Sequence, residues 1–105
     1  MISRNVTLKL KANSAPEFTQ IIEEEILPLL RKQKGFRDEI TFLAPERSEA
    51  LAISVWDSNI EADNYMRTGY PGVLKALSKV VEGTPKVETF DLASSTFHKV
   101  VGRGL

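Results

Sequence analysis

The stretch FRDEITFLAPERSEALAISVW, residues 36–56, contains two apolar segments separated by APERSE at 44–49. Proline, serine and charged residues between two segments of strand-forming residues are typical of a β-hairpin. The period-2 alternation of the second segment predicts a strand with one bulky and one small face. The bulky face holds Leu51, Ile53 and Val55, and the other face holds Ala50, Ala52, Ser54 and the only tryptophan of the chain, Trp56.

The residues before this hairpin predict a strand followed by a helix. Apolar residues alternate with polar ones from Asn5 to Leu10, which is the period of a half-buried strand. From Phe18 to Leu30 the apolar residues are spaced by three and four, as in an amphipathic helix. Pro28 lies inside this helix and is expected to kink it, because proline removes a backbone hydrogen bond to the preceding turn.

Downstream of Trp56 the sequence predicts a broken helix and a fourth strand. A capping pattern at Ser58 starts a helix that GYPG, at 69–72, interrupts. Apolar spacing predicts a further helix through Val81, and KVETFDL at 86–92 predicts a strand. The order β-α-β-β-α-β is typical of a ferredoxin-like α+β fold, in which helices cover one face of an antiparallel sheet.

The second face of such a sheet carries apolar side chains that no helix covers. Exposed apolar patches of this kind mark interfaces, so we predict a homodimer. Residues 1–92 form the single predicted domain, and 93–105 form a C-terminal extension. Because Phe97, Val100 and Val101 in this extension also need a packing surface, we expect it to contact the dimer partner.

The composition argues against several classes of function. The chain has 14 basic and 14 acidic residues, and a net charge of zero argues against a nucleic-acid partner. It has no cysteine and one histidine, His98, which argues against a metal site built on these ligands, and it has no cofactor motif. It also has no apolar run of membrane-spanning length. We therefore predict a cytoplasmic protein with no metal, no cofactor and no membrane association.

Trp56 marks the candidate site, as part of the core or as the wall of a pocket. The small side chains before it leave volume, and Tyr65 lies on the helix that folds back over the sheet, so a flat aromatic ligand fits here. Asn5 and Tyr70 are further candidates for ligand contact, each with a purely structural alternative. His98 has the ordinary pKa of a base near neutral pH, but its place in the tail favours a solvated or interface role. No catalytic base is identified.

Four segments resemble the antibiotic biosynthesis monooxygenase family: LPLLRKQKGF at 27–36, ISVWDS at 53–58, Tyr65 and EGTPKVETFDL at 82–92. The resemblance implies a dimeric α+β barrel, in which two sheets pack face to face with the helices outside. Members that oxidise quinols use no metal or flavin, because a deprotonated, electron-rich substrate can itself supply electrons to dioxygen. The resemblance thus implies the same absence of a cofactor here.

The match to the family's site residues is partial. Trp56 matches the strand-end tryptophan of the quinol-oxidising members, whereas their asparagine and tyrosine positions hold Ala52 and Ala62, and no arginine is evident in the third helix. In the haem-degrading branch the tryptophan position falls at Tyr65 and the iron-ligating histidine position at Ser78, so haem degradation is not implied.

Two functions are consistent with this sequence. The first is a cofactor-independent monooxygenase that acts on an aromatic or quinol-like small molecule near Trp56 and Tyr65. The alternative is a non-catalytic or stress-associated dimeric barrel that holds a small hydrophobic ligand without turning it over.

Overall fold

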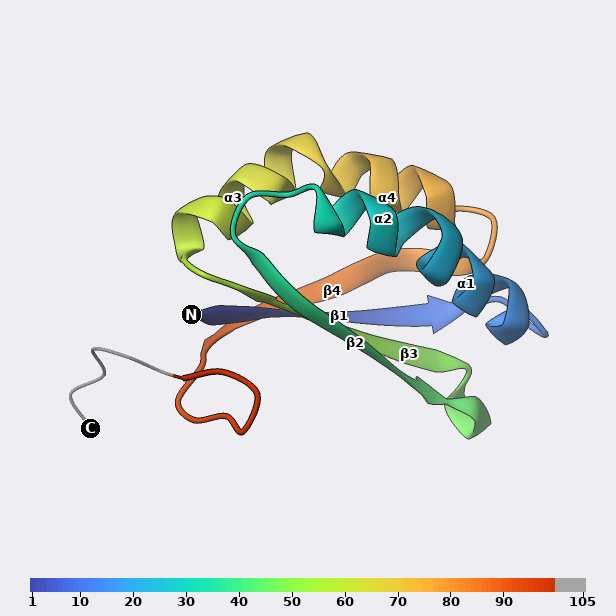
Figure 1. The fold of residues 1–105 in the computed structure, drawn as a ribbon. Coiled ribbons are helices and arrows are strands. Elements are labelled where there is room, and N and C mark those ends of the chain that lie inside the picture. The colour runs from blue at the N-terminus through green and yellow to red at the C-terminus, as the bar shows by residue number, and fades with distance from the viewer. Residues whose placement is uncertain (100–105) are drawn as a thin grey trace.

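A computed structural model describes residues 1–99 of the chain. It contains one four-stranded antiparallel sheet in the order β2-β3-β1-β4, with helices α1 to α4 on one face (Figure 1). Among these residues no helix combines the length and the apolar character needed to cross a membrane. The elements are β1 (Ile2–Leu10), α1 (Ala15–Ile21), a π-helical turn η1 (Ile22–Ile26), α2 (Leu27–Arg31), β2 (Phe36–Ala44), a 3-10 turn η2 (Pro45–Arg47), β3 (Glu49–Trp56), α3 (Asn59–Thr68), α4 (Tyr70–Leu77) and β4 (Val81–Asp91).

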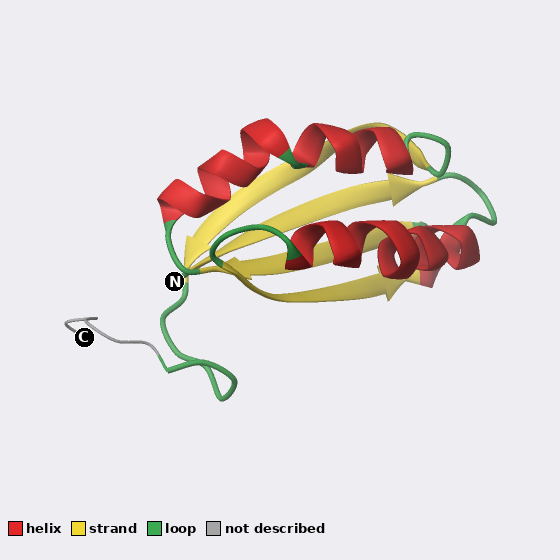
Figure 2. Ribbon diagram, turned by 45° about the horizontal axis from the view of Figure 1, so that its top comes forward, coloured by secondary structure: helices red, strands yellow, loops and turns green. Residues whose placement is uncertain are grey.

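The topology confirms the predicted ferredoxin-like α+β fold. β1 lies in the middle of the sheet and pairs antiparallel with β3 and β4, and β3 also pairs with β2 across the predicted hairpin. Figure 2 shows the helices as two rows lying side by side over the sheet, one formed by α1 and α2 and the other by α3 and α4. The opposite face of the sheet has no helix over it (Figure 1).

The first helical row is disturbed near Pro28, as predicted, and the disturbance takes the form of a π-helical turn. The backbone N–H of Leu27 donates to the carbonyl of Ile22, five residues back. Pro28 has no N–H, and in a regular α-helix its ring would clash with the carbonyl four residues earlier. One extra residue in the turn relieves both problems.

The second helical row is broken at Gly69, between the end of α3 at Thr68 and the start of α4 at Tyr70. This confirms the predicted interruption at GYPG. At the start of α3 the Ser58 side chain accepts a hydrogen bond from the backbone N–H of Glu61 at 3.5 Å, as the capping pattern predicts.

β4 begins at Val81, so the prediction of a helix through this residue and a strand only at 86–92 was wrong. Gly83 has a φ of +67°, and the pairing of β4 with β1 shifts register nearby, which marks a bulge. β4 is an edge strand, where a bulge glycine and a proline without an N–H are both tolerated. Gly83 and Pro85, which suggested the end of a helix, therefore lie inside the strand.

The core fills the space between the sheet and the helices, and Trp56, Phe18, Leu8 and Val80 are its largest fully buried side chains. Alternate residues of β1 and β3 point into it. The other set forms what we call the open face, which includes apolar residues of β2, β3 and β4 beside polar residues of β1. The open face comprises Asp38, Ile40 and Phe42 of β2, Leu51, Ile53 and Val55 of β3, Ser3, Asn5 and Thr7 of β1, and Lys86, Glu88 and Phe90 of β4.

The described part of the tail, 93–99, lies on the side of the sheet away from the helices (Figure 1). It leaves β4 at one edge of the sheet, and the imidazole of His98 contacts the carboxylate of Asp38 in β2 at the other edge. Phe97 stays exposed. Val100 and Val101, for which a packing surface was predicted, lie outside the described residues.

Candidate functional site

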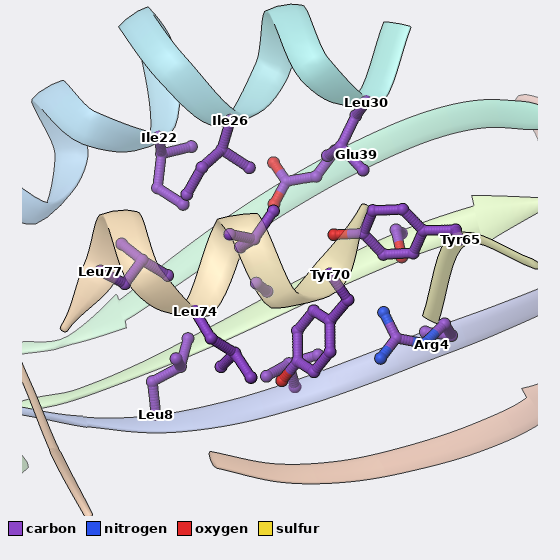
Figure 3. Close-up of a pocket in the computed structure, with 14 residues that line it drawn as sticks. Arg4, Leu8, Ile22, Ile26, Leu30, Glu39, Tyr65, Tyr70, Leu74 and Leu77 are labelled. Atoms are coloured by element: carbon purple, nitrogen blue, oxygen red, sulfur yellow. The ribbon is translucent and has the colours of Figure 1, made fainter. Parts of the chain in front are cut away.

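A cavity of about 40 Å³ lies between the sheet and the two helical rows (Figure 3). Ala52 and Ser54, from the small face of β3, form part of its lining, and Arg4, Glu39, Tyr65 and Tyr70 bring polar groups to it. The rest of the lining is aliphatic and comes from β1, the first helical row and α4: Val6, Leu8, Ile22, Ile26, Leu30, Val73, Leu74 and Leu77.

Three polar residues of the cavity form a row across three strands. Arg4 of β1 pairs with Ser54 of β3, and Ser54 pairs with Glu39 of β2. Directly opposed residues of antiparallel strands share a face, so all three side chains lie on the helix-covered side. Because neighbouring strands lie about 4.8 Å apart, the backbones of Arg4 and Glu39 are separated by about 10 Å, with the short Ser54 between them.

Arg4 is a buried cation whose neighbours are aromatic rings. Its side chain is 3% exposed, and its guanidinium carbon lies 5.3 Å from the ring centroid of Tyr65 and 4.7 Å from that of Tyr70. It also contacts the sulfur of Met66. Within residues 1–99 no carboxylate lies at ion-pair distance from it, and Asp63 acts on it only from further away. Burial lowers the pKa of Arg4 from its ordinary value, but a guanidinium remains charged in proteins.

Glu39 brings the only carboxyl group to the lining of this cavity. The hydroxyl of Thr41 donates a hydrogen bond to it. Burial raises the pKa of Glu39 above its ordinary value, and the hydrogen bond from Thr41 opposes this shift. A carboxylate with a raised pKa is a stronger base than an ordinary one and is suited to accept a proton from a bound molecule.

Trp56 lies behind the cavity rather than in its wall. It is fully buried, its Nε1 donates to Ser54 Oγ at 2.9 Å, and it does not line the cavity. Its ring stacks on Tyr65 with centroids 4.9 Å apart, and it meets Phe36 edge-on at 5.6 Å. Trp56 therefore belongs to the core and holds Tyr65 and Ser54 in place.

Tyr65 and Tyr70 line the cavity from the two sides of the Gly69 break, with ring centroids 6.0 Å apart. Figure 3 shows the Arg4 guanidinium next to the Tyr70 ring. Burial raises the pKa of Tyr65 to about 12 and also raises that of Tyr70. Both phenols are therefore protonated at neutral pH.

Asn5 does not join the other predicted site residues. It lies on the open face, where Ser3 Oγ donates to its Oδ1 at 2.9 Å, and the sheet separates it from the cavity. His98, at Asp38, also lies away from the cavity lining. The structure thus brings together Trp56, Tyr65 and Tyr70.

Arg4 and Glu39 were not predicted from the sequence. Arg4 is in phase with Val6 and Leu8 on β1, and a charged residue in a buried alternating row was a usable signal. Glu39 offered no such signal, because the apolar residues of β2 that alternate with it, Ile40 and Phe42, lie on the open face. Over residues 1–99 no cluster of three or more His, Cys, Asp or Glu side chains is placed to hold a metal ion.

Comparisons with known proteins identify the fold. No protein-family model matches the chain, and no curated protein matches it either. A putative antibiotic biosynthesis monooxygenase from Bordetella bronchiseptica matches with a TM-score of 0.76 and 11% identity, over 89% of this chain and 97% of that one. SnoaB, a cofactor-independent oxygenase from Streptomyces nogalater, matches with a TM-score of 0.71 and 13% identity, over 90% and 95% of the two chains.

A third solved structure, the protein NE2512 of unknown function from Nitrosomonas europaea, matches with a TM-score of 0.76 and 14% identity, over 94% of this chain and 95% of that one. At these identities the likeness concerns the fold alone. The chain therefore shares the α+β fold of structures named as monooxygenases and of at least one whose function is unknown.

Proposed function

We propose that this protein binds a small aromatic molecule in the cavity and oxygenates it with dioxygen, without an added cofactor. One observation carries the proposal: a carboxyl group and a cation lie at opposite ends of one apolar cavity. The carboxyl group is Glu39, whose pKa is raised, and the cation is the buried Arg4. The shared fold with SnoaB, itself described as a cofactor-independent oxygenase, supports the reaction class.

Oxygenation without a cofactor needs a group that accepts the substrate's proton and a positive charge that stabilises the substrate anion. In the proposed reaction Glu39 takes the hydroxyl proton of a hydroquinone-like ring, and the charge of Arg4 favours the resulting anion. The anion gives electrons to dioxygen. One ring C–H bond is replaced by a C–O bond, the substrate loses four electrons to become a hydroxyquinone, and the second oxygen atom leaves as water.

The cavity has to widen to admit such a ligand. A volume of about 40 Å³ holds one or two water molecules, whereas ligand pockets usually measure about 300–1,000 Å³. Leu74 of α4 lines the cavity and is 37% exposed, so α4 separates the cavity from solvent at this point. The proposal therefore includes an outward movement of α4 about its joint with α3 at Gly69.

Oxygen uptake with a panel of hydroquinones and naphthohydroquinones tests the proposal. The wild type should consume oxygen faster than the autoxidation blank, with one atom of ¹⁸O₂ entering the product. Glu39→Gln should lower the rate by about 100-fold or more, the usual contribution of a general base. Glu23→Gln, the same change at an exposed residue of the first helical row, is the matched control. Uptake at the blank rate, or an unchanged rate in Glu39→Gln, would refute the reaction.

The alternative function is binding without turnover. The small cavity volume favours it, as does Ala52 at a position where the quinol-oxidising members of the resembling family carry asparagine. This alternative predicts a saturable change in the fluorescence of Trp56 on addition of an aromatic ligand, with oxygen uptake no faster than in the blank.

We also propose that two copies of the chain pair through their open faces. In the single chain Phe42 is 52% exposed and Phe90 is 50% exposed, and both lie on this face. Apolar side chains in such numbers on one sheet face are typical of an interface. Light scattering should give twice the chain mass of 11.7 kDa, and the mass of a single chain would contradict the pairing.

A further inference from the structure

Within the described part of the chain Arg4 has no carboxylate at ion-pair distance, and only the more distant charge of Asp63 acts on it. The Arg4 side chain is 3% exposed, and the ion pairs of residues 1–99 all join other residues. An unpaired charge removed from water is costly, usually by several kcal/mol. Contacts with the faces of Tyr65 and Tyr70 offset only part of this, because a cation–π contact contributes about 0.5–2 kcal/mol. An anionic ligand would supply the missing charge.

Ser54 places a hydrogen-bond donor beside this cation. Trp56 Nε1 is a donor only, so Ser54 Oγ must accept in their 2.9 Å hydrogen bond. The hydroxyl proton of Ser54 is then left for another acceptor, and among residues 1–99 no hydrogen bond donated by this hydroxyl is recorded. Ser54 lines the cavity and is the cross-strand neighbour of Arg4. The guanidinium of Arg4 and the hydroxyl of Ser54 therefore lie at the same part of the cavity.

We propose that Arg4 and Ser54 form an anion-binding site that takes the carboxylate of an aromatic hydroxy acid. The inference rests on the proposed function, because it places the ligand's hydroxyl group at Glu39, at the other end of the row. Arg4 and Glu39 are about 10 Å apart at the backbone, and the cavity between them has to widen, by the movement of α4 proposed above, before one ring fits above Ser54. The guanidinium fork matches a carboxylate, and a single cation with one hydroxyl suits one negative charge better than a phosphate dianion.

The test compares 2,5-dihydroxybenzoate with 2,5-dihydroxybenzamide, two ligands of similar shape that differ in charge. Isothermal titration calorimetry on the wild type should show the acid binding at least about tenfold more tightly, because charge-assisted hydrogen bonds are the stronger ones. Arg4→Gln should remove this preference, and Arg4→Lys should retain part of it because it keeps the charge. Arg47→Gln is the matched control, since Arg47 is exposed and pairs with Glu49 on the surface.

The outcomes separate this inference from the proposed function. Equal affinity of the wild type for acid and amide would overturn the anion site, whatever the oxygen electrode shows, and so would binding of neither ligand. A preference for the acid without oxygen uptake would overturn the oxygenation and support the anion site. Circular dichroism of the two Arg4 variants establishes that they fold, and the comparison of ligands on the wild type is decisive if they do not.

Discussion

Each face of the sheet carries exceptions to the usual distribution of side chains, and the exceptions on the two faces are of opposite kinds. The covered face, which the helices shield from water, carries the buried Arg4 and the half-buried Glu39 at its cavity. The open face, which no helix covers, carries Ile40, Phe42 and Phe90, each about half exposed in the single chain. Buried charges and exposed apolar groups are the informative exceptions to the rule that apolar residues lie inside.

The buried charge and the exposed apolar groups point to different functions, because different partners offset the free-energy cost of each. A buried cation is stabilised by an anion and by donors, which a small ligand can supply inside a closed cavity. An exposed apolar sheet face is stabilised by a large complementary surface, which a second chain can supply. The covered face is therefore the place to test for binding and chemistry, and the open face the place to test for association.

Truncation of Trp56 should have the largest effect on stability. If it does not, the covered face does not contribute more to the fold than the open face. Trp56→Ala removes the ring that stacks on Tyr65 and orients Ser54, so the free energy of unfolding should fall by about 3–5 kcal/mol. Phe42→Ala on the open face should cost less than half of this in the dissociated chain, because that ring is 52% exposed. Urea denaturation followed by far-UV circular dichroism measures both. Equal losses would mean that the two faces contribute alike to the fold.

A charge placed on the open face should affect association more than folding. Ile53→Glu puts a carboxylate at the centre of the proposed interface and should weaken dimerisation by about 100-fold or more, because an unpaired charge would be buried there. Ile60→Glu is the matched control, since Ile60 lies on α3 and is 79% exposed. Sedimentation equilibrium gives the dissociation constants. An unchanged dimer in Ile53→Glu would remove the open face as the interface.

The architecture was predictable from the sequence because the periodicities of 2 and of 3 to 4 residues follow from which side of each element is buried. Trp56 and Tyr65 were predicted near each other because a strand end and the helix that returns over it must meet. The start of β4 was not predictable in this way, since Gly83 and Pro85 usually end elements but are tolerated in an edge strand.

The site was only partly predictable, because its residues depend on which face the helices cover and on register. Alternation places the side chains of Asn5 and Val6 on different faces of the sheet, but it does not show which of the two faces the helices cover. Glu39 reaches the cavity because β2 pairs with β3 after an irregularity between Phe36 and Asp38, which aligns Glu39 with Ser54. Such an offset is a tertiary feature with no local signal.

The smallest expected effect is the contribution of Glu39, on the covered face, to the pH dependence of the free energy of unfolding. Because burial raises the pKa of Glu39 in the folded state, the folded chain binds more protons than the unfolded chain between the ordinary carboxyl pKa and the raised one. The free energy of unfolding should therefore fall as pH rises through this window, and Glu39→Gln should lack this component. Relative to the variant, the wild type should lose stability between pH 4 and pH 7, by an amount within the usual range for one substitution.

Denaturation curves of both proteins at each pH, with Glu23→Gln as the charge-matched control, measure this difference. A wild type that gains stability relative to Glu39→Gln as pH rises would show that the folded chain favours the ionised carboxylate. In that case Glu39 would be a paired anion rather than a proton acceptor. The covered face would then hold a balanced pair of charges at its cavity, and the reason to expect an anionic ligand at Arg4 would disappear with it.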